Sequence, residues 1–349
     1  MANALYDTWK QIKALEMTPP IHTFLSDTFT QNEGAVMAED ARYDYYKGTV
    51  PMAPFVVPGT GGKNMPREKF QTKDIGFPTI APERTVNYDE YAMQRMFGEE
   101  IGGSLDPNSR LAKLKAQDLA FLRNAIAARE EWMTAQVLFT GRLDILEYLE
   151  GGQVVKGSRA ADYDFTNQYA PDKKWNESGA DVYGDFMQMI DMVSEGNGSP
   201  DIAIFGVDVR SAILSDEKLL KLLDVRNGFF GRVEPDKSNY QKATQYVGTL
   251  STGTELYCYT GKYRETMGGA EKLLIPKGKI LLGGGKLLRK FYGPVAQVEK
   301  EGEDPKVYAA PQVPFRYSKA GSDSSMQRLT SRPMLVPYNV DAWAVGTVL

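Results

Sequence analysis

DPNSRLAKLKAQDLAFLRNAIAAREEWMTAQVLFTG, residues 106–141, predicts one uninterrupted helix and sets the plan of the whole chain. An N-cap aspartate, Asp106, precedes a proline at the first helical position, and Gly141 provides the stop. Between them, apolar residues recur at steps of three and four. About 34 residues at roughly 1.5 Å each make a rod of about 50 Å, where a globular helix usually has about 11 to 12 residues. We therefore expect a spine around which other elements pack.

Beyond this spine, the pattern predicts two further helices and then mostly strands. Apolar spacing from Val182 to Val193 predicts a second helix that ends at Gly196. Residues 200–206 (PDIAIFG) predict a buried strand, and a third helix is expected from Asp208 to Leu223. Further strands are expected at 245–250, 255–260, 273–275, 280–282, 294–298, 307–315 and 334–349. Helices and strands are segregated around one long helix, which indicates the α+β class.

Ahead of the spine lie an arm and a long excursion. Residues 1–47 predict an arm with an apolar patch at Phe24 and Leu25. Residues 48–82 hold six prolines, where average usage of about 5% predicts roughly two, so a helix is excluded there. The apolar limb VPMAPFVV (50–57), a glycine-rich tip and a second limb ending in IGFP (75–78) predict a long hairpin. A two-stranded ribbon alone is marginally stable in water, so we expect it to lie on another surface.

Composition excludes several classes of protein. The 349 residues carry 41 basic and 45 acidic side chains, a formal charge of −4, whereas a dedicated nucleic-acid binder is usually basic. One cysteine, Cys258, and one histidine, His22, can form neither an intramolecular disulfide nor a thiolate and imidazole zinc cage. A catalytic triad would need His22 as its base, and His22 lies in the arm. The start shows no secretory signal and no segment predicts a membrane span, which favours a reducing compartment.

The remaining residues of chemical interest have structural interpretations. Cys258 lies in the alternating segment ELYCY (255–259), where we expect a small buried thiol. The glycine-rich pieces at 59–64 and 283–287 lack the spacing of a phosphate-binding loop. The paired carboxylates Glu99-Glu100 and Glu130-Glu131 are interpreted as solvated surface rather than as an acid–base site. A carboxylate-based metal enzyme stays open as a hypothesis.

The order of these parts resembles a known family. The segments that carry the resemblance are PIHTFL (20–25), VLFTG (137–141), IAIFG (202–206), DVRNG (224–228), SRPMLV (331–336) and DAWAV (341–345). Together they resemble the major capsid protein E family of tailed phages, the lambda-type shell subunits with the Hong Kong 97 capsid fold. Glycines 283–285 are not a feature of that family.

The resemblance implies a division of the chain into five parts. These are an arm at 1–47, an extended loop at 48–85, a peripheral domain at 86–180 with the spine helix at 106–141, an axial domain at 181–325, and returning C-terminal strands at 326–349. In this fold the extended loop of one subunit lies across the peripheral domain of a neighbour. We therefore expect inter-subunit contacts at Phe55, Val56, Val57, Phe77, Phe24 and Leu25.

The function that the resemblance implies is structural, with no catalytic, cofactor or metal site. Subunits would associate into pentamers and hexamers of an icosahedral shell around double-stranded DNA, without sequence-specific binding and without a membrane. Because the excursion begins by residue 48, we expect a separate scaffolding protein, together with a portal and in some particles a decoration protein. The location would be the virion capsid, assembled in the bacterial host cytoplasm. The alternative is an encapsulin-like cage of the same fold that holds protein cargo.

Overall fold

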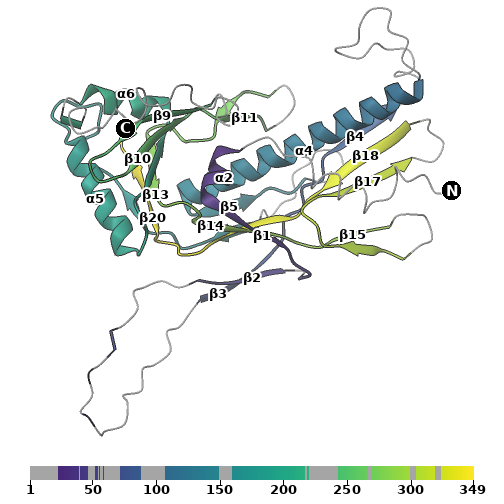
Figure 1. The fold of residues 1–349 in the computed structure, drawn as a ribbon, viewed down its shortest axis with the longest axis horizontal. Coiled ribbons are helices and arrows are strands. Elements are labelled where there is room, and N and C mark those ends of the chain that lie inside the picture. The colour runs from purple at the N-terminus through teal and green to yellow at the C-terminus, as the bar shows by residue number, and fades with distance from the viewer. Residues whose placement is uncertain are drawn as a thin grey trace, which may run out of the picture.

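The structure is a computed structural model that describes residues 23–38, 40–45, 52–53, 55, 58, 71–87, 107–148, 159–216, 218–219, 243–265, 269–298, 304–318 and 324–349. Figure 1 shows a long helix, α4, that crosses the molecule. A mixed sheet lies at its C-terminal end, and a smaller sheet lies along its N-terminal half.

The predicted spine is confirmed as α4, which spans Pro107–Thr140. Gly141 ends it with a left-handed φ of +67°, and its N–H donates to the carbonyl oxygen of Val137 at 2.8 Å. A Cβ at this position would lie 2.2 Å from Cβ of Phe165. Glycine is therefore required here for both its backbone conformation and its lack of a side chain.

The larger sheet, called the axial sheet below, has six strands and is buried on both faces. Two helices, α5 (Val182–Glu195) and α6 (Val207–Ser215), pack on one face. In its strand β8, Ala203 and Phe205 point to these helices, and Ile204 points to a second core on the opposite face. The strands in spatial order are β7 (Gln168–Tyr169), β20 (Trp343–Thr347), β13 (Lys279–Gly283), β8 (Ile202–Phe205), β10 (Glu255–Tyr259) and β9 (Thr244–Thr249).

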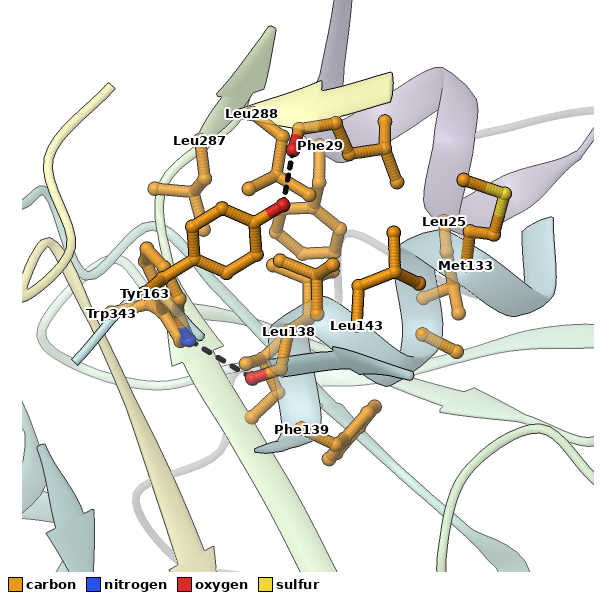
Figure 2. Close-up of a cluster of buried hydrophobic side chains, with 14 of the residues drawn as sticks. Leu25, Phe29, Met133, Leu138, Phe139, Leu143, Tyr163, Leu287, Leu288 and Trp343 are labelled. Carbon is orange, nitrogen blue, oxygen red and sulfur yellow. Dashed lines mark hydrogen bonds between the residues drawn. The ribbon is translucent and has the colours of Figure 1, made fainter. Parts of the chain in front are cut away.

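The second core joins the arm, the end of the spine and the axial sheet (Figure 2). It includes a short helix of the arm, α2 (Phe24–Phe29), and a three-stranded sheet of β1 (Thr30–Ala35), β14 (Leu288–Tyr292) and β19 (Pro333–Pro337). The Trp343 indole N–H donates to the carbonyl oxygen of Leu138 at 2.9 Å, and the Tyr163 hydroxyl donates to that of Leu335 at 2.6 Å. These buried polar groups are thus paired inside an apolar core.

A peripheral sheet lies along the spine. It contains β17 (Val313–Ser318), β18 (Ser324–Thr330) and β4 (Glu83–Asn87), and it buries Leu329 against Leu122 and Ile126 of α4. Four two-stranded hairpins complete the described elements. They are β2 (Asp40–Tyr45) with β3 (Gln71–Gly76), β5 (Arg142–Ile145) with β6 (Arg159–Asp162), β11 (Lys262–Tyr263) with β12 (Lys272–Leu273), and β15 (Val295–Gln297) with β16 (Lys306–Tyr308).

Several predicted boundaries are corrected by the structure. The third helix ends at Ser215, because the Asp216 carboxylate accepts the N–H groups of Lys218 and Leu219 at 2.8 and 3.1 Å and starts a new turn. The strand predicted at 307–315 is two strands, β16 and β17, separated around Pro311, which has no N–H to donate. The strand predicted at 334–349 is also two, β19 and β20, and they join different sheets.

The strand pairing also bears on the domain ranges. Strands β14 and β17 fall within the range expected for the axial domain, yet they pair with β1 and β19 and with β18, respectively. The hairpin before the spine starts at Asp40, earlier than the expected residue 48, because β2 pairs with β3 from Asp40↔Gly76 to Tyr45↔Gln71. Most of the predicted limb at 50–57 lies outside the described residues.

Candidate assembly surfaces and the arm junction

Strands β2 and β3 lie at the lower edge of the body in Figure 1. Between the two strands, the structure describes residues 52, 53, 55 and 58. The side chains of Met52 and Phe55 are 88% and 103% exposed. Burying a phenylalanine side chain contributes about 1.5–3 kcal/mol relative to leaving it in water. This excursion therefore offers apolar surface that the single chain leaves in solvent.

The chain that follows β3 is embedded in the body. Phe77 is 2% exposed, and its carbonyl oxygen accepts a hydrogen bond from Arg332 at 3.4 Å. Gly293 faces the Phe77 ring so closely that an added Cβ would lie 2.6 Å from Cγ of the ring. Three residues further on, Ile80 forms a backbone bridge with Ser331. The base of the hairpin is thus fixed where the chain leaves β3.

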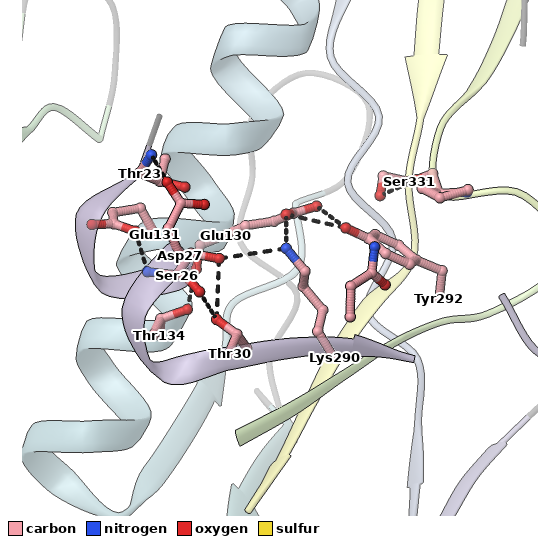
Figure 3. Close-up of polar contacts among 12 residues, drawn as sticks. Thr23, Ser26, Asp27, Thr30, Glu130, Glu131, Thr134, Lys290, Tyr292 and Ser331 are labelled. Atoms are coloured by element: carbon pink, nitrogen blue, oxygen red, sulfur yellow. Dashed lines mark hydrogen bonds and ion pairs between the residues drawn. The ribbon is translucent and has the colours of Figure 1, made fainter. Parts of the chain in front are cut away.

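The arm meets the spine through a buried carboxylate. Glu131, on α4, accepts the N–H groups of Leu25 and Ser26 on its two oxygens, each at 2.8 Å (Figure 3). Those N–H groups belong to the first turn of α2, where a helix has no internal acceptors. The N-cap residue of α2, Thr23, makes no side-chain cap hydrogen bond. Glu131 therefore caps a helix that lies 105 to 106 positions earlier in the chain.

A third donor links Glu131 to the axial sheet. The hydroxyl of Tyr259, on β10, donates to the same carboxylate at 3.0 Å. Glu131 is 3% exposed, and burial raises the pKa of its carboxyl, while the bonds from Leu25, Ser26 and Tyr259 lower it in part. The nearby Asp27 carboxylate raises this pKa further. Burial and the Glu131 charge also raise the pKa of the Tyr259 hydroxyl, which stays a donor.

The neighbouring carboxylate, Glu130, has a different set of partners. It forms an ion pair with the Lys290 ammonium group at 2.9 Å and accepts the Tyr292 hydroxyl at 3.2 Å. Both partners are on β14, the strand that pairs with β1 of the arm. Burial, followed by the Glu130 charge, raises the pKa of the Tyr292 hydroxyl. Two adjacent glutamates thus contact the two ends of the same arm segment, α2 directly and β1 through β14.

This junction is the feature that the sequence interpretation missed. Glu130 and Glu131 were expected in solvent, and that expectation is wrong, because they are 8% and 3% exposed. A signal was present in the helical spacing. Glu130 comes four residues after Ile126 and Glu131 seven residues before Leu138, so both fall on the apolar stripe of the helix. Glu99 and Glu100 lie outside the described residues.

The six predicted interface residues lie in different environments. Phe55 is fully exposed, and Val56 and Val57 lie outside the described residues. Phe24 is partly buried and packs on the rings of Tyr257 and Tyr259, with centroids 5.6 and 5.4 Å apart. Leu25 and Phe77 are 0% and 2% exposed in the single chain. The side chains of these two residues pack in the core of the single chain.

The remaining candidates for chemical activity are Cys258, His22 and clusters of metal-binding side chains. Cys258 is 0% exposed, as the alternating strand predicted, and burial raises the pKa of its thiol. His22 lies outside the described residues. Within the described ranges, no three His, Cys, Asp or Glu side chains gather in a way that could hold a metal ion. In the same part of the chain, no helix is long and apolar enough to cross a membrane.

Comparison with known families places these features in context. The sequence model described as phage major capsid protein E matches residues 7–348. The chain belongs to the phage major capsid protein E family. Its function is therefore structural, as a subunit of a phage or prophage capsid, and the predicted family is confirmed.

Relatives of this family member agree with that assignment. The major capsid protein of Enterobacteria phage P21 is 24% identical over 319 residues, which cover 89% of each chain. The P21 prophage-derived major head protein of Escherichia coli O6:H1 strain CFT073 shows the same identity and coverage.

Solved structures show the shared fold of this family member. A capsid protein assigned to a prophage of E. coli CFT073 has a TM-score of 0.68 and 17% identity, with 99% of each chain covered. A phage-related protein from Bordetella bronchiseptica RB50 has a TM-score of 0.52 and 11% identity, with 96% of this chain and 95% of that chain covered. The predicted α+β class and Hong Kong 97 capsid fold are confirmed.

Proposed function

We propose that this chain is the repeating subunit of a closed icosahedral shell, built from pentamers and hexamers, that encloses double-stranded DNA. The observation that carries the proposal is the hairpin β2–β3, which lies at the lower edge of the body and leads to the exposed side chains of Met52 and Phe55. Because the contact repeats in every subunit, a modest apolar burial at each hairpin adds up over a closed symmetric assembly. No single strong site is needed.

The receiving surface in this proposal is the peripheral domain of a neighbouring subunit, as the resemblance implies. Phe55, Val56, Val57 and Phe24 stay in the proposed contact. Leu25 and Phe77 leave it, because they are buried within one chain. The peripheral surface also carries an apolar ring of its own, since Phe121 on α4 is 41% exposed.

The proposal includes partners beyond other copies of the chain. A separate scaffolding protein, a portal and a decoration protein would act during assembly in the bacterial host cytoplasm. DNA in the lumen would be held without sequence-specific contacts. The formal charge of −4 supports this, because an acidic subunit has little overall attraction for phosphates.

The first experiment replaces residues 47–69 with a short Gly-Ser turn. This keeps both paired strands and Phe77, whose removal would damage the core. We expect a soluble subunit with an unchanged unfolding midpoint that forms no shells in negative-stain microscopy, with scaffolding protein supplied. Shells of normal size would contradict the proposed contact, and an unfolded product would show that the segment belongs to an intramolecular core.

Point variants of Phe55 provide a matched control. Phe55→Asp places a charge where an interface would exclude water, which costs several kcal/mol per copy. Phe55→Leu keeps an apolar side chain. We expect shells from Phe55→Leu and dispersed subunits from Phe55→Asp, measured by sedimentation at equal concentration. Equal assembly of the two variants would contradict the role of this ring.

The contents of the shell distinguish the proposal from a protein-filled cage. Particles purified from infected or induced cells, treated with nuclease outside and then opened, should release protected double-stranded DNA. Protected protein cargo with no DNA would favour the encapsulin-like alternative.

A further inference from the structure

Helix α2 cannot hold its place by its own backbone. It has six residues, fewer than two turns, and isolated helices shorter than about 12–15 residues are marginal in water. Its N-cap residue supplies no side-chain acceptor. Two of its first-turn amides, those of Leu25 and Ser26, are satisfied by Glu131 of the spine. Asp27, within the helix, accepts the N–H of Thr23 at 2.9 Å. The helical form of this part of the arm thus depends on a group outside it.

The path of the chain transmits this position to the hairpin. Directly after α2, β1 pairs in parallel with β14 from Thr30↔Leu288 to Ala35↔Tyr292. The next residue, Val36, donates its N–H to the carbonyl oxygen of Tyr292 at 2.8 Å. Only residues 37–39 then separate this anchored segment from β2, and Met37 among them is 71% exposed. The position of the first strand of the hairpin therefore depends on α2 together with the pairing of β1 on β14.

The electrostatics of Glu131 indicate that it sets the position of α2 rather than adding to the overall stability of the chain. Among the residues that the structure describes, its three donors, two backbone amides and one phenol, are all neutral. The ammonium of Lys290 pairs with Glu130 instead. A buried carboxylate without a cationic partner is costly, and well-packed apolar residues would often be as stable. The bidentate acceptance of two consecutive amides gives geometric specificity in return.

We propose that Glu131 is a positioning residue that holds α2 against the spine and so fixes where the hairpin β2–β3 leaves the subunit. The role of Glu131 in holding α2 does not depend on the proposed function. Only the statement that the hairpin position matters for shell assembly rests on it. Glu131 joins three elements, α2 by the Leu25 and Ser26 amides, α4 by its own backbone, and β10 by the Tyr259 hydroxyl. A single side chain thereby links the arm to both the spine and the axial sheet.

The test uses the dispersed full-length chain and Glu131→Gln. Glutamine keeps the size of the side chain but turns one acceptor oxygen into an NH₂ donor, which opposes one of the two amides. We expect hydrogen exchange of the Leu25 and Ser26 amides to rise at least tenfold, while amides in the centre of α4 keep their rates. Tyr259→Phe is the matched control, since it removes the third donor and leaves both amide bonds.

A distance measurement reports the position directly. Spin labels on Met37→Cys and Leu214→Cys, in a Cys258→Ala background, use two side chains that are 71% and 45% exposed. We expect a narrow distance distribution in the parent and in Tyr259→Phe, and a broad one in Glu131→Gln. A narrow distribution in Glu131→Gln, or equal broadening in Tyr259→Phe, would overturn the proposal.

Two further outcomes keep the test decisive. If Glu131→Gln does not fold, the parent protein still decides, because fast exchange at Leu25 and Ser26 in the parent would overturn the proposal and protection equal to that of α4 would support it. Shell formation is scored separately. A parent chain that never forms shells would refute the proposed function, while the exchange and distance results would still decide the role of Glu131.

Discussion

Changing Phe77 to alanine should impair folding, whereas changing Phe55 to alanine should leave folding intact. Phe77 is 2% exposed, with Gly293 against its ring, whereas Phe55 is 103% exposed. Phe77→Ala should lower the free energy of unfolding by about 3–5 kcal/mol, from lost burial and the cavity left behind. Phe55→Ala should change it by no more than about 0.5 kcal/mol. Against a total of about 5–15 kcal/mol, the first loss is large.

Urea unfolding of the dispersed subunit, followed by tryptophan fluorescence and circular dichroism, measures the difference. With a slope of about 3 kcal/mol/M, a loss of about 4 kcal/mol moves the midpoint down by roughly 1.3 M. The Phe55→Ala midpoint should match that of the parent. The reasoning fails if Phe77→Ala unfolds at the parent midpoint, or if both variants shift equally, because burial would then not distinguish the two rings.

Two other predictions concern the end of the spine and the arm junction. Gly141→Ala should destabilise the chain by more than the roughly 1 kcal/mol of an unfavourable left-handed φ, because the new Cβ would lie 2.2 Å from Cβ of Phe165; an unchanged urea midpoint would contradict this. Burial raises the pKa of Glu131 above 4.5 in the folded chain, so in the pH interval just above 4.5 unfolding releases a proton, and this group lowers the free energy of unfolding as pH rises through its folded pKa. Relative to Glu131→Gln, the parent should therefore lose stability as the pH rises from 4.5 through the folded pKa of Glu131, and a relative gain measured by urea unfolding would show that the sign is wrong.

The elements that sequence predicted well are those defined by local pattern. The spine from Pro107 to Thr140, helix α5 and strand β8 each carry their periodicity and their stop signals within a short window. Local pattern could not show which strands pair. Strand β14 pairs with β1, which lies more than 250 positions earlier. Neither segment contains a sequence pattern that identifies the other as its partner.

The candidate site was predictable only in part, for a related reason. Apolar residues beside a ribbon have the same pattern whether they are buried in the same chain or against a neighbour, so Leu25, Phe77 and Phe55 were grouped together. Only the three-dimensional burial separates them. Likewise, two adjacent glutamates look solvated in sequence, because the amides that Glu131 binds lie over 100 positions away.

The place of β20 in the axial sheet has a consequence for synthesis of the chain. This strand, residues 343–347, is later in the sequence than every other described strand, yet it lies between β7 and β13 rather than at an edge. During translation, at about 5–20 residues per second, β13 has no antiparallel partner on that side until this strand has left the ribosome. Nascent chains on one messenger RNA therefore reach the ribosome exit with an unfinished axial sheet. A subunit that lacks β20 has an incomplete axial sheet, so shell growth is disfavoured on any nascent chain that has not yet exposed this strand.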